Sequence, residues 1–173
     1  MSAEIDIRAL EQESIQVFVE QCASKGFLKG SVLDFGCGKQ PWRTIIEAAG
    51  SEYTGYDRVT FPANVSGRNI GPDIWKMKFD TVISTQCLQY WSALDETLSE
   101  LRLLLNAGGS LLLTGPYAWP LVEQEDRWHL TPFQVRVLLL KASFRDVLVE
   151  PRGQFSFAGE KRWYTGWQAV ARL

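Results

Sequence analysis

Two glycines separated by one residue, Gly36 and Gly38, follow a short apolar run at residues 31–35. Glycine at the end of a strand permits a sharp turn and leaves no side chain between the backbone and a ligand. Peptide N–H groups at the start of a following helix would face an anionic or polar group. Taken alone, the pattern predicts a ligand-binding turn and an ordinary strand-to-helix turn about equally well.

A carboxylate at the end of the next apolar segment makes the ligand-binding reading the better one. Residues 53–57 read as a second strand that ends at Asp57, nineteen residues after Gly38. A carboxylate at this position accepts hydrogen bonds from ribose hydroxyls in nucleotide-binding folds. The alternative role for Asp57 is a helix cap or a solvated turn residue. With both glycines in place, we favour the ribose role.

The residue type at position 41 narrows the class of ligand. A dinucleotide-binding fingerprint needs glycine there, and this chain has Pro41. Proline lacks the N–H group that would hold a pyrophosphate at the helix end. The sequence therefore disfavours a nicotinamide-dependent oxidoreductase. It favours a ligand with ribose and adenine but no phosphate, of which S-adenosylmethionine is a common example.

These residues need a framework of alternating elements. The patterns predict a helix over residues 4–24, and strands at 31–35, 53–57, 79–84, 110–114, 144–149 and 163–173. Strands that alternate with helical segments form a mostly parallel sheet covered on both faces. Ligands bind such α/β sheets beyond the carboxyl ends of the strands, which is where the glycines and Asp57 fall.

Local signals predict where the intervening helices begin and end. Pro41 suits the first turn of a helix that ends at Gly50, and Ser92 can cap the next helix, which Gly108-Gly109 would end. Thr131 and Gln134, with Pro132 between them, predict a capping box at the start of a later helix.

Composition bounds the class of protein. A chain of 173 residues with 46% hydrophobic and 22% charged residues predicts one globular domain over 1–173: a lead-in at 1–30, a core at 31–149 and a terminal strand region at 150–173. The net charge of −2 and the pI near 5.5 argue against binding nucleic acid or an anionic membrane. The three cysteines lack metal-ligand spacing, so we expect no metal, free thiols and a cytoplasmic protein. The N-terminus resembles no signal peptide, and no apolar run is long enough for a membrane span.

Five motifs in order resemble those of the class I S-adenosylmethionine-dependent methyltransferases, in particular the small type 11 methyltransferase-domain group. They are Val32–Gly38, Lys39–Trp42 with Tyr53–Asp57, Phe79–Leu88, Leu101–Leu113 and Asp126–Thr131. The resemblance covers about residues 31–149. It implies a single Rossmann-like doubly wound sheet, mostly parallel, with an antiparallel last strand.

The resemblance also implies roles for individual residues. Asp34, Gly36, Cys37 and Gly38 would bound the methionine end of the cofactor, and Asp57 would bind the ribose. The floor near the sulfonium would be lined by Ser84, Thr85 and Gln86.

Among the departures from the family pattern, two bear most on function. Leu88-Gln89-Tyr90 stands where the family often has Leu-Glu-His, and the third strand with its adenine-binding acid is not recognisable. Asn69 or Asp73 could take the adenine role in this shortened stretch. The departures motivate an alternative function, a non-catalytic binding or scaffolding protein of the same fold.

Methyl transfer from a sulfonium requires positioning more than it requires a catalytic residue. The candidates for a base or polar wall group are His129, Tyr117 and Tyr90, although His129 more simply packs beside its neighbour Trp128. Among the seven tryptophans, we expect Trp91, Trp119 and Trp128 near the ligand. We expect Trp163 and Trp167 in the core of the last strands. The acceptor is expected to be a small molecule, and the subgroup resemblance points to a sugar or glycan precursor.

Overall fold

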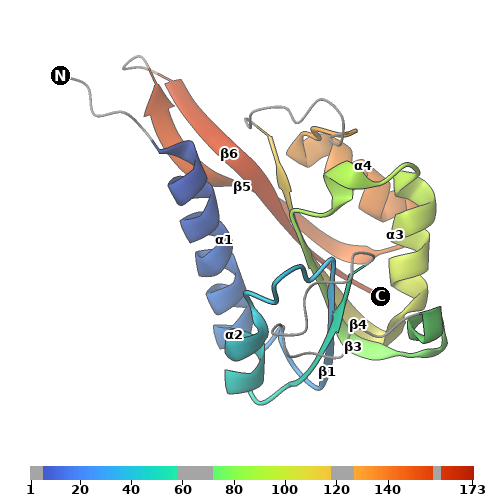
Figure 1. Cartoon of the computed structure of the whole chain (residues 1–173). Helices are drawn as coiled ribbons and strands as arrows, with labels where there is room; N and C mark the ends of the chain where they lie inside the picture. Colours follow the sequence, from blue (N-terminus) through green and yellow to red (C-terminus); the bar gives the residue numbers. More distant parts are fainter. Residues whose placement is uncertain (1–5, 58–71, 118–126, 158–160) are drawn as a thin grey trace.

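The computed structural model describes residues 6–57, 72–117, 127–157 and 161–173. Figure 1 shows a central sheet with helices packed against both of its faces. The six strands follow the order β2-β1-β3-β4-β6-β5. In chain order they are β1 (Ser31–Phe35), β2 (Glu52–Tyr56), β3 (Phe79–Thr85), β4 (Leu105–Pro116), β5 (Arg145–Phe157) and β6 (Lys161–Arg172).

Four α-helices and two short 3-10 helices connect the strands. The α-helices are α1 (Ile7–Ser24), α2 (Arg43–Ala48), α3 (Leu94–Leu103) and α4 (Pro132–Lys141), and the 3-10 helices are η1 (Pro72–Lys76) and η2 (Leu88–Tyr90). Among the described residues, none of the helices is long and apolar enough to cross a membrane.

The strand directions confirm the predicted sheet. β1 pairs in parallel with β2 and β3, and β3 pairs in parallel with β4. The last strand, β6, runs antiparallel to both β4 and β5. Within the described parts of the chain, β2 is an edge strand, so the strand that the family pattern places third is not seen there.

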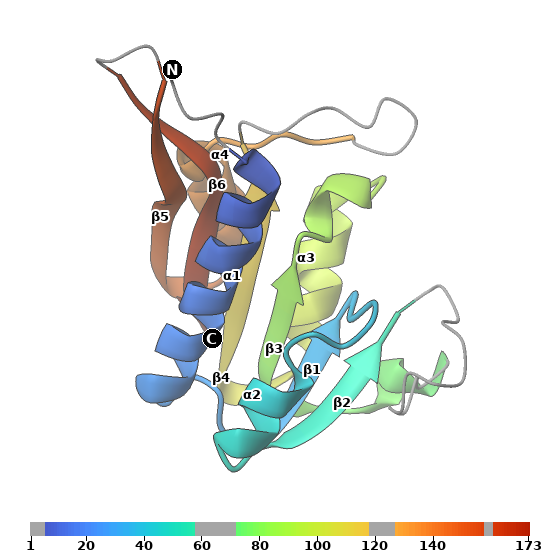
Figure 2. The ribbon, with the colours of Figure 1, turned by 60° about the vertical axis from the view of Figure 1, so that its left-hand side comes forward.

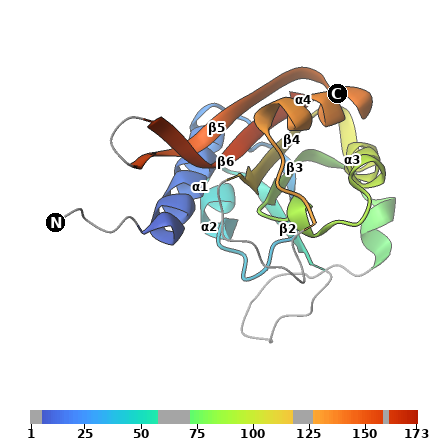
Figure 3. The ribbon, with the colours of Figure 1, turned by 90° about the horizontal axis from the view of Figure 1, so that it is seen from above.

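The helices divide between the two faces of the sheet, as the view from above shows (Figure 3). α1 and α2 cover one face, where Phe18 and Ile46 belong to the same buried cluster as Val32 of β1. α3 and α4 cover the other, where Leu98 and Leu139 pack with the strands. Apolar side chains on both faces exclude water, which stabilises a sheet buried on both sides.

Three predicted helix boundaries were wrong. Pro41 precedes α2, which begins at Arg43, and Ser92 does not cap α3, because Ala93 occupies the N-cap position without a side-chain hydrogen bond. Gly108-Gly109 does not end α3 but lies inside β4. The chain enters this strand directly after α3, and the pairing of β4 with β3 is irregular between Phe79 and Thr81. Gly108 adopts a φ of +73° within this irregular segment, a conformation that glycine tolerates.

The prediction for α4 was correct. Thr131 accepts a hydrogen bond from the N–H of Gln134, whose side chain bonds back to the Thr131 N–H, and Pro132 occupies the first turn. The predicted core position of Trp167 is confirmed, since only 1% of this residue is exposed. Trp163 is 42% exposed, so its predicted core position was wrong. It lies in the first part of β6, before Gly166, where the strand pairs with β5 but not with β4.

Candidate functional site

The carboxyl ends of the parallel strands β1 to β4 meet at one edge of the sheet (Figure 2). A cleft of about 760 Å³ opens at this edge. Its walls come from the ends of β1 and β2, from η1 and from the segment between β3 and α3. Clefts of this size bind small molecules in α/β proteins, at the edge where we expected the ligand.

The glycine turn is tied to the end of β2 by three hydrogen bonds. The N–H groups of Gly36 and Cys37 donate to the carbonyl oxygen of Tyr56 over 2.8 and 3.0 Å. The N–H of Gly38 donates to Oδ2 of Asp57 over 2.9 Å. Gly36 and Asp57 both line the cleft, so the structure brings together the two features that carried the sequence argument.

Glycine is required at position 36 for two reasons. Its φ of +79° lies in the left-handed region, and the space that a Cβ atom would occupy is filled by Sγ of Cys87. Gly38 also has a positive φ, +49°, but no atom lies within 4 Å of the position of a Cβ there. Gly36 therefore allows the cleft residue Cys87 to pack directly on the backbone turn.

Two of the residues predicted to contact the cofactor lie behind the cleft wall. Asp34 is buried, and its Oδ2 accepts a hydrogen bond from the Tyr53 hydroxyl over 2.9 Å. Burial raises the pKa of this carboxyl to about 7, against the effect of the Tyr53 hydrogen bond and with a contribution from the nearby charge of Asp57. Burial likewise raises the pKa of the Cys37 thiol to about 12. Neither side chain is among the cleft residues, so both serve first to support the turn.

The predicted floor residues differ in their placement. Ser84 is fully buried, and Oγ1 of Thr85 accepts a hydrogen bond from the indole of Trp42 over 2.8 Å. Neither residue lines the cleft, whereas Gln86 does. Of these three residues, Gln86 is therefore the one whose position matches the predicted floor of the cofactor site.

Gln86 is held in an unusual conformation by several bonds. Its φ is +50°, and its N–H donates to Thr114 of the neighbouring strand β4. Its side-chain amide donates to Oε1 of Glu11 on α1 over 2.6 Å, and its carbonyl oxygen accepts from the Gln89 amide. Non-glycine residues with a strained backbone persist where surrounding contacts determine them, often at functional sites.

Aromatic rings form the other wall of the cleft. The ring centroid of Phe35 lies 5.0 Å from that of Tyr56, 4.9 Å from that of Trp91 and 6.3 Å from that of Trp75. All four rings line the cleft. Sequence reasoning identified only Trp91; for Phe35 and Tyr56 the available signal was their position at the ends of two adjacent strands.

Within the described parts of the chain, the charged residues that line the cleft are mainly acidic. They are Asp57, Glu96, Glu100 and Arg127. The carboxylates of Glu96 and Glu100 come from α3, whose positions four apart lie on one face of the helix. An excess of carboxylates and aromatic faces is suited to a ligand that carries positive charge.

The remaining predicted residues are divided by the structure. Tyr90 lines the cleft, whereas Tyr117, 43% exposed at the end of β4, and the half-buried His129 do not. Asp73 is exposed on η1 and pairs with Lys76 over 2.8 Å, away from the cleft lining. Asn69 and Trp119 lie outside the described residues, and Trp128 lines a neighbouring groove.

Comparisons with known proteins agree with this geometry. Residues 7–146 match a family model described as a methyltransferase domain. A solved S-adenosylmethionine-dependent methyltransferase from Archaeoglobus fulgidus superposes with a TM-score of 0.71 and 14% identity, covering 91% of this chain and 94% of that one. The 1,6-didemethyltoxoflavin-N1-methyltransferase of Burkholderia thailandensis, solved with S-adenosylhomocysteine, gives 0.66 and 19%, covering 89% and 76%. No curated protein sequence matches.

At identities this low, the superpositions show only that the fold is shared. The match to the family model shows that the chain belongs to the family. Human N-acetylserotonin methyltransferase, solved with S-adenosylmethionine, gives a TM-score of 0.63 at 18% identity, covering 96% of this chain and 54% of that chain. These structures confirm the class I fold that the motifs predicted. What each of them binds is a property of that protein.

Proposed function

The chain belongs to the methyltransferase-domain family and is an enzyme of the class I methyltransferases, and from that membership we propose that it binds S-adenosylmethionine in the cleft and methylates a small molecule. The observation that carries the proposal is the Gly38–Asp57 hydrogen bond, which holds a glycine turn and a carboxylate side by side at the cleft. We also propose that the whole chain acts as one catalytic unit, because one sheet joins β2 to β5.

The residues of the cleft fit the proposed cofactor. Asp57 lines the cleft, and we expect it to accept hydrogen bonds from the ribose hydroxyls, since a carboxylate offers several acceptor sites. The aromatic rings of Tyr56, Trp75 and Trp91 offer flat apolar faces for a purine. Gln86, fixed by Glu11, closes the floor at the end of β3.

When bound, the cofactor supplies a methyl group already activated by a positively charged sulfur. Asp57 and Gln86 would hold the cofactor so that its methyl group would be available to a lone pair of the acceptor. The chain's residues hold the two reactants at reacting distance and exclude water. The carboxylates of Glu96 and Glu100 line the same cleft. If the acceptor must lose a proton, either carboxylate can receive it.

The acceptor is proposed only as a small molecule. The toxoflavin and serotonin derivatives named for two of the similar structures are ring compounds. The sugar or glycan acceptor expected from the subgroup resemblance gains no support from them and stays a prediction. His129 and Tyr117 also stay predictions for a catalytic role, without a place on the cleft wall.

Titration calorimetry with S-adenosylmethionine and S-adenosylhomocysteine tests the proposal. We expect a dissociation constant in the micromolar range for the intact protein and at least a tenfold weaker one for Asp57→Ala. The matched control is Glu52→Gln, an exposed carboxylate at the start of β2, the strand that Asp57 follows. No heat with either ligand at millimolar concentration would sink the cofactor assignment.

Two further arms separate the rival functions. Incubation with an acceptor panel and detection of S-adenosylhomocysteine distinguishes an enzyme from a non-catalytic binding module, which would bind the cofactor but release none of this product. Competition with NAD tests the dinucleotide alternative, which predicts displacement of the bound adenosine ligand.

A further inference from the structure

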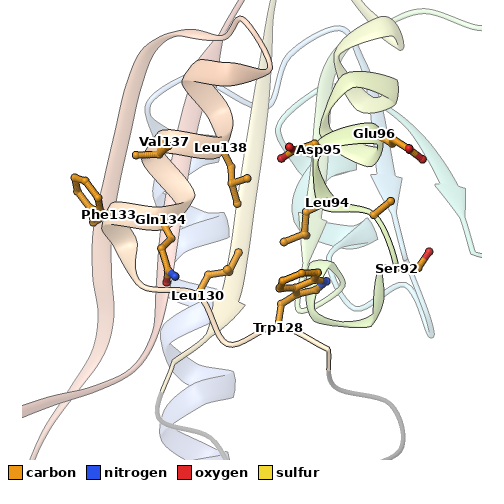
Figure 4. A pocket seen from close by; sticks show the side chains of 11 residues that line it. Ser92, Leu94, Asp95, Glu96, Trp128, Leu130, Phe133, Gln134, Val137 and Leu138 are labelled. Atoms are coloured by element: carbon orange, nitrogen blue, oxygen red, sulfur yellow. The ribbon is translucent and has the colours of Figure 1, made fainter.

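A second hollow of about 540 Å³ lies between α3 and α4, next to the cleft. Six large apolar side chains contribute to its lining: Leu94, Trp128, Leu130, Phe133, Val137 and Leu138. We call it the α3–α4 groove. In Figure 4, Leu94 and Leu138 face each other from the two helices, and Trp128 lies across one end. Its size and lining are those of a small-molecule site rather than of a packing defect.

The groove adjoins the proposed cofactor cleft. Ser92, Ala93 and Glu96 line both hollows. The chain between β3 and α3 therefore forms a shared wall, and a molecule in the groove can extend one end past Ser92 into the cleft. Because Ala93 and not Ser92 is the N-cap of α3, the Ser92 hydroxyl is not used in capping the helix at this junction.

Trp128 is fixed rather than loosely placed. Its indole N–H donates to the carbonyl oxygen of Trp91 over 2.7 Å, and Trp91 itself lines the cofactor cleft. This bond links the groove wall to the cleft wall. A flat indole held in a defined position offers a surface on which a planar ring can stack.

The packing of α4 does not account for the apolar residues that it exposes here. The helix buries Val135 and Leu139 against the sheet, while Phe133 is 74% exposed and lines the groove. The acidic residues at the start of α3 are explained by the helix dipole, which favours carboxylates near a helix N-terminus.

We infer that the α3–α4 groove binds the apolar, ring-bearing part of the methyl acceptor, with the atom to be methylated directed past Ser92 into the cleft. This inference rests on the proposed function, since it names the class of acceptor for the same site. The occupant is a neutral planar hydrophobic molecule, because most of the groove wall is apolar and one of its faces is an indole.

The test uses N-phenyl-1-naphthylamine, a neutral fluorophore whose emission rises in apolar sites. We expect the full-length protein to bind it with a micromolar dissociation constant. Phe133→Glu and Val137→Glu place a charge in the groove and should each weaken binding at least tenfold. The matched control is Leu140→Glu on the same helix, where a half-exposed leucine lies outside the groove lining and binding should be unchanged. Circular dichroism melting checks that each variant is folded.

Several outcomes overturn the inference. The first is that the intact protein does not bind the probe, and the second is that the Phe133, Val137 and Leu140 variants bind it equally well. Displacement of the probe by S-adenosylhomocysteine would place the probe in the cleft instead of the groove. A dimer in sedimentation velocity that Phe133→Glu dissociates would assign the groove to a second copy instead. Binding of the probe in the groove without any binding of S-adenosylhomocysteine would leave an apolar ligand site but defeat the proposed function, and with it the assignment of the groove to a methyl acceptor.

Discussion

Glu11 and Arg152 lie 141 residues apart in the sequence and form a buried ion pair, with Nη2 of the arginine 2.6 Å from Oε1 of the glutamate. The same oxygen accepts the side-chain amide of Gln86. Arg152 also donates to the Ser14 hydroxyl and to the Glu11 carbonyl oxygen. One carboxylate thus connects α1 and β5 to the floor of the proposed cofactor site.

Removing the guanidinium should destabilise the whole protein. Arg152→Met leaves the buried Glu11 carboxylate without its counter-charge, which typically costs about 3–5 kcal/mol. Urea unfolding followed by circular dichroism measures this loss. The exposed pair of Arg43 and Glu47 provides the control, since Glu47→Gln should cost less than about 1 kcal/mol. Equal losses in the two variants would show that the buried pair contributes nothing specific.

Gly36→Ala should damage the cleft more than Gly38→Ala. Both glycines have a positive φ, so alanine at either position costs about 1–2 kcal/mol of backbone strain. Only at position 36 does the new methyl group collide with Cys87. We therefore expect a larger loss of stability, together with at least a tenfold loss of S-adenosylhomocysteine affinity, for Gly36→Ala.

Titration calorimetry and urea unfolding of the two glycine variants measure these effects. The Gly36→Ala, Cys87→Gly double variant should recover part of the loss, because the sulfur no longer occupies the space. If the two alanine variants behave alike, the contact with Cys87 has no role in shaping the cleft.

The sequence was informative where a feature depends on neighbouring residues. The turn at Gly36, the strand ending before Asp57 and the capping box at Thr131 are all local patterns, and each lies where it was predicted. The mostly parallel sheet followed from alternation of strands and helices, because parallel strands need crossover helices.

Features that depend on distant residues were not predictable. Gln86 bonds to Glu11, and Trp75 contacts Phe35, only once the complete sheet has brought these distant segments together. Asp34 was expected at the ligand. Side chains alternate between the two faces of a strand, and this one turns to the Tyr53 hydroxyl inside the protein.

The capping box of α4 should contribute measurably to stability. Thr131→Ala removes the hydroxyl that accepts the Gln134 N–H, and loss of such a cap typically costs about 1 kcal/mol. Urea unfolding of this variant is compared with that of Ser99→Ala, which removes an exposed hydroxyl bonded within α3. The prediction is contradicted if Thr131→Ala costs no more than the Ser99 change.

Stability should depend on pH through Asp34. Burial raises the pKa of this carboxyl in the folded protein from 3.8 to about 7. Below about pH 4 the group therefore makes its full contribution to the free energy of unfolding. Between pH 4 and 7 the unfolded chain releases this proton more readily than the folded one. The contribution of Asp34 to the free energy of unfolding should then fall by roughly 1.4 kcal/mol per pH unit, and it is lost once the pH passes 7.

Asp34→Asn stays neutral and keeps an acceptor for the Tyr53 hydroxyl, so its stability relative to the wild type should rise across this pH range. Urea unfolding from pH 4.5 to 8 measures the difference between the two proteins. Asp80→Asn is the control, because hydrogen bonds from Ser31 and Asn106 lower the pKa of Asp80 and place its titration below this range. Asp80→Asn should therefore lower stability by the same amount at every pH tested. A constant difference between Asp34→Asn and the wild type would mean that Asp34 is ionised in the folded protein throughout.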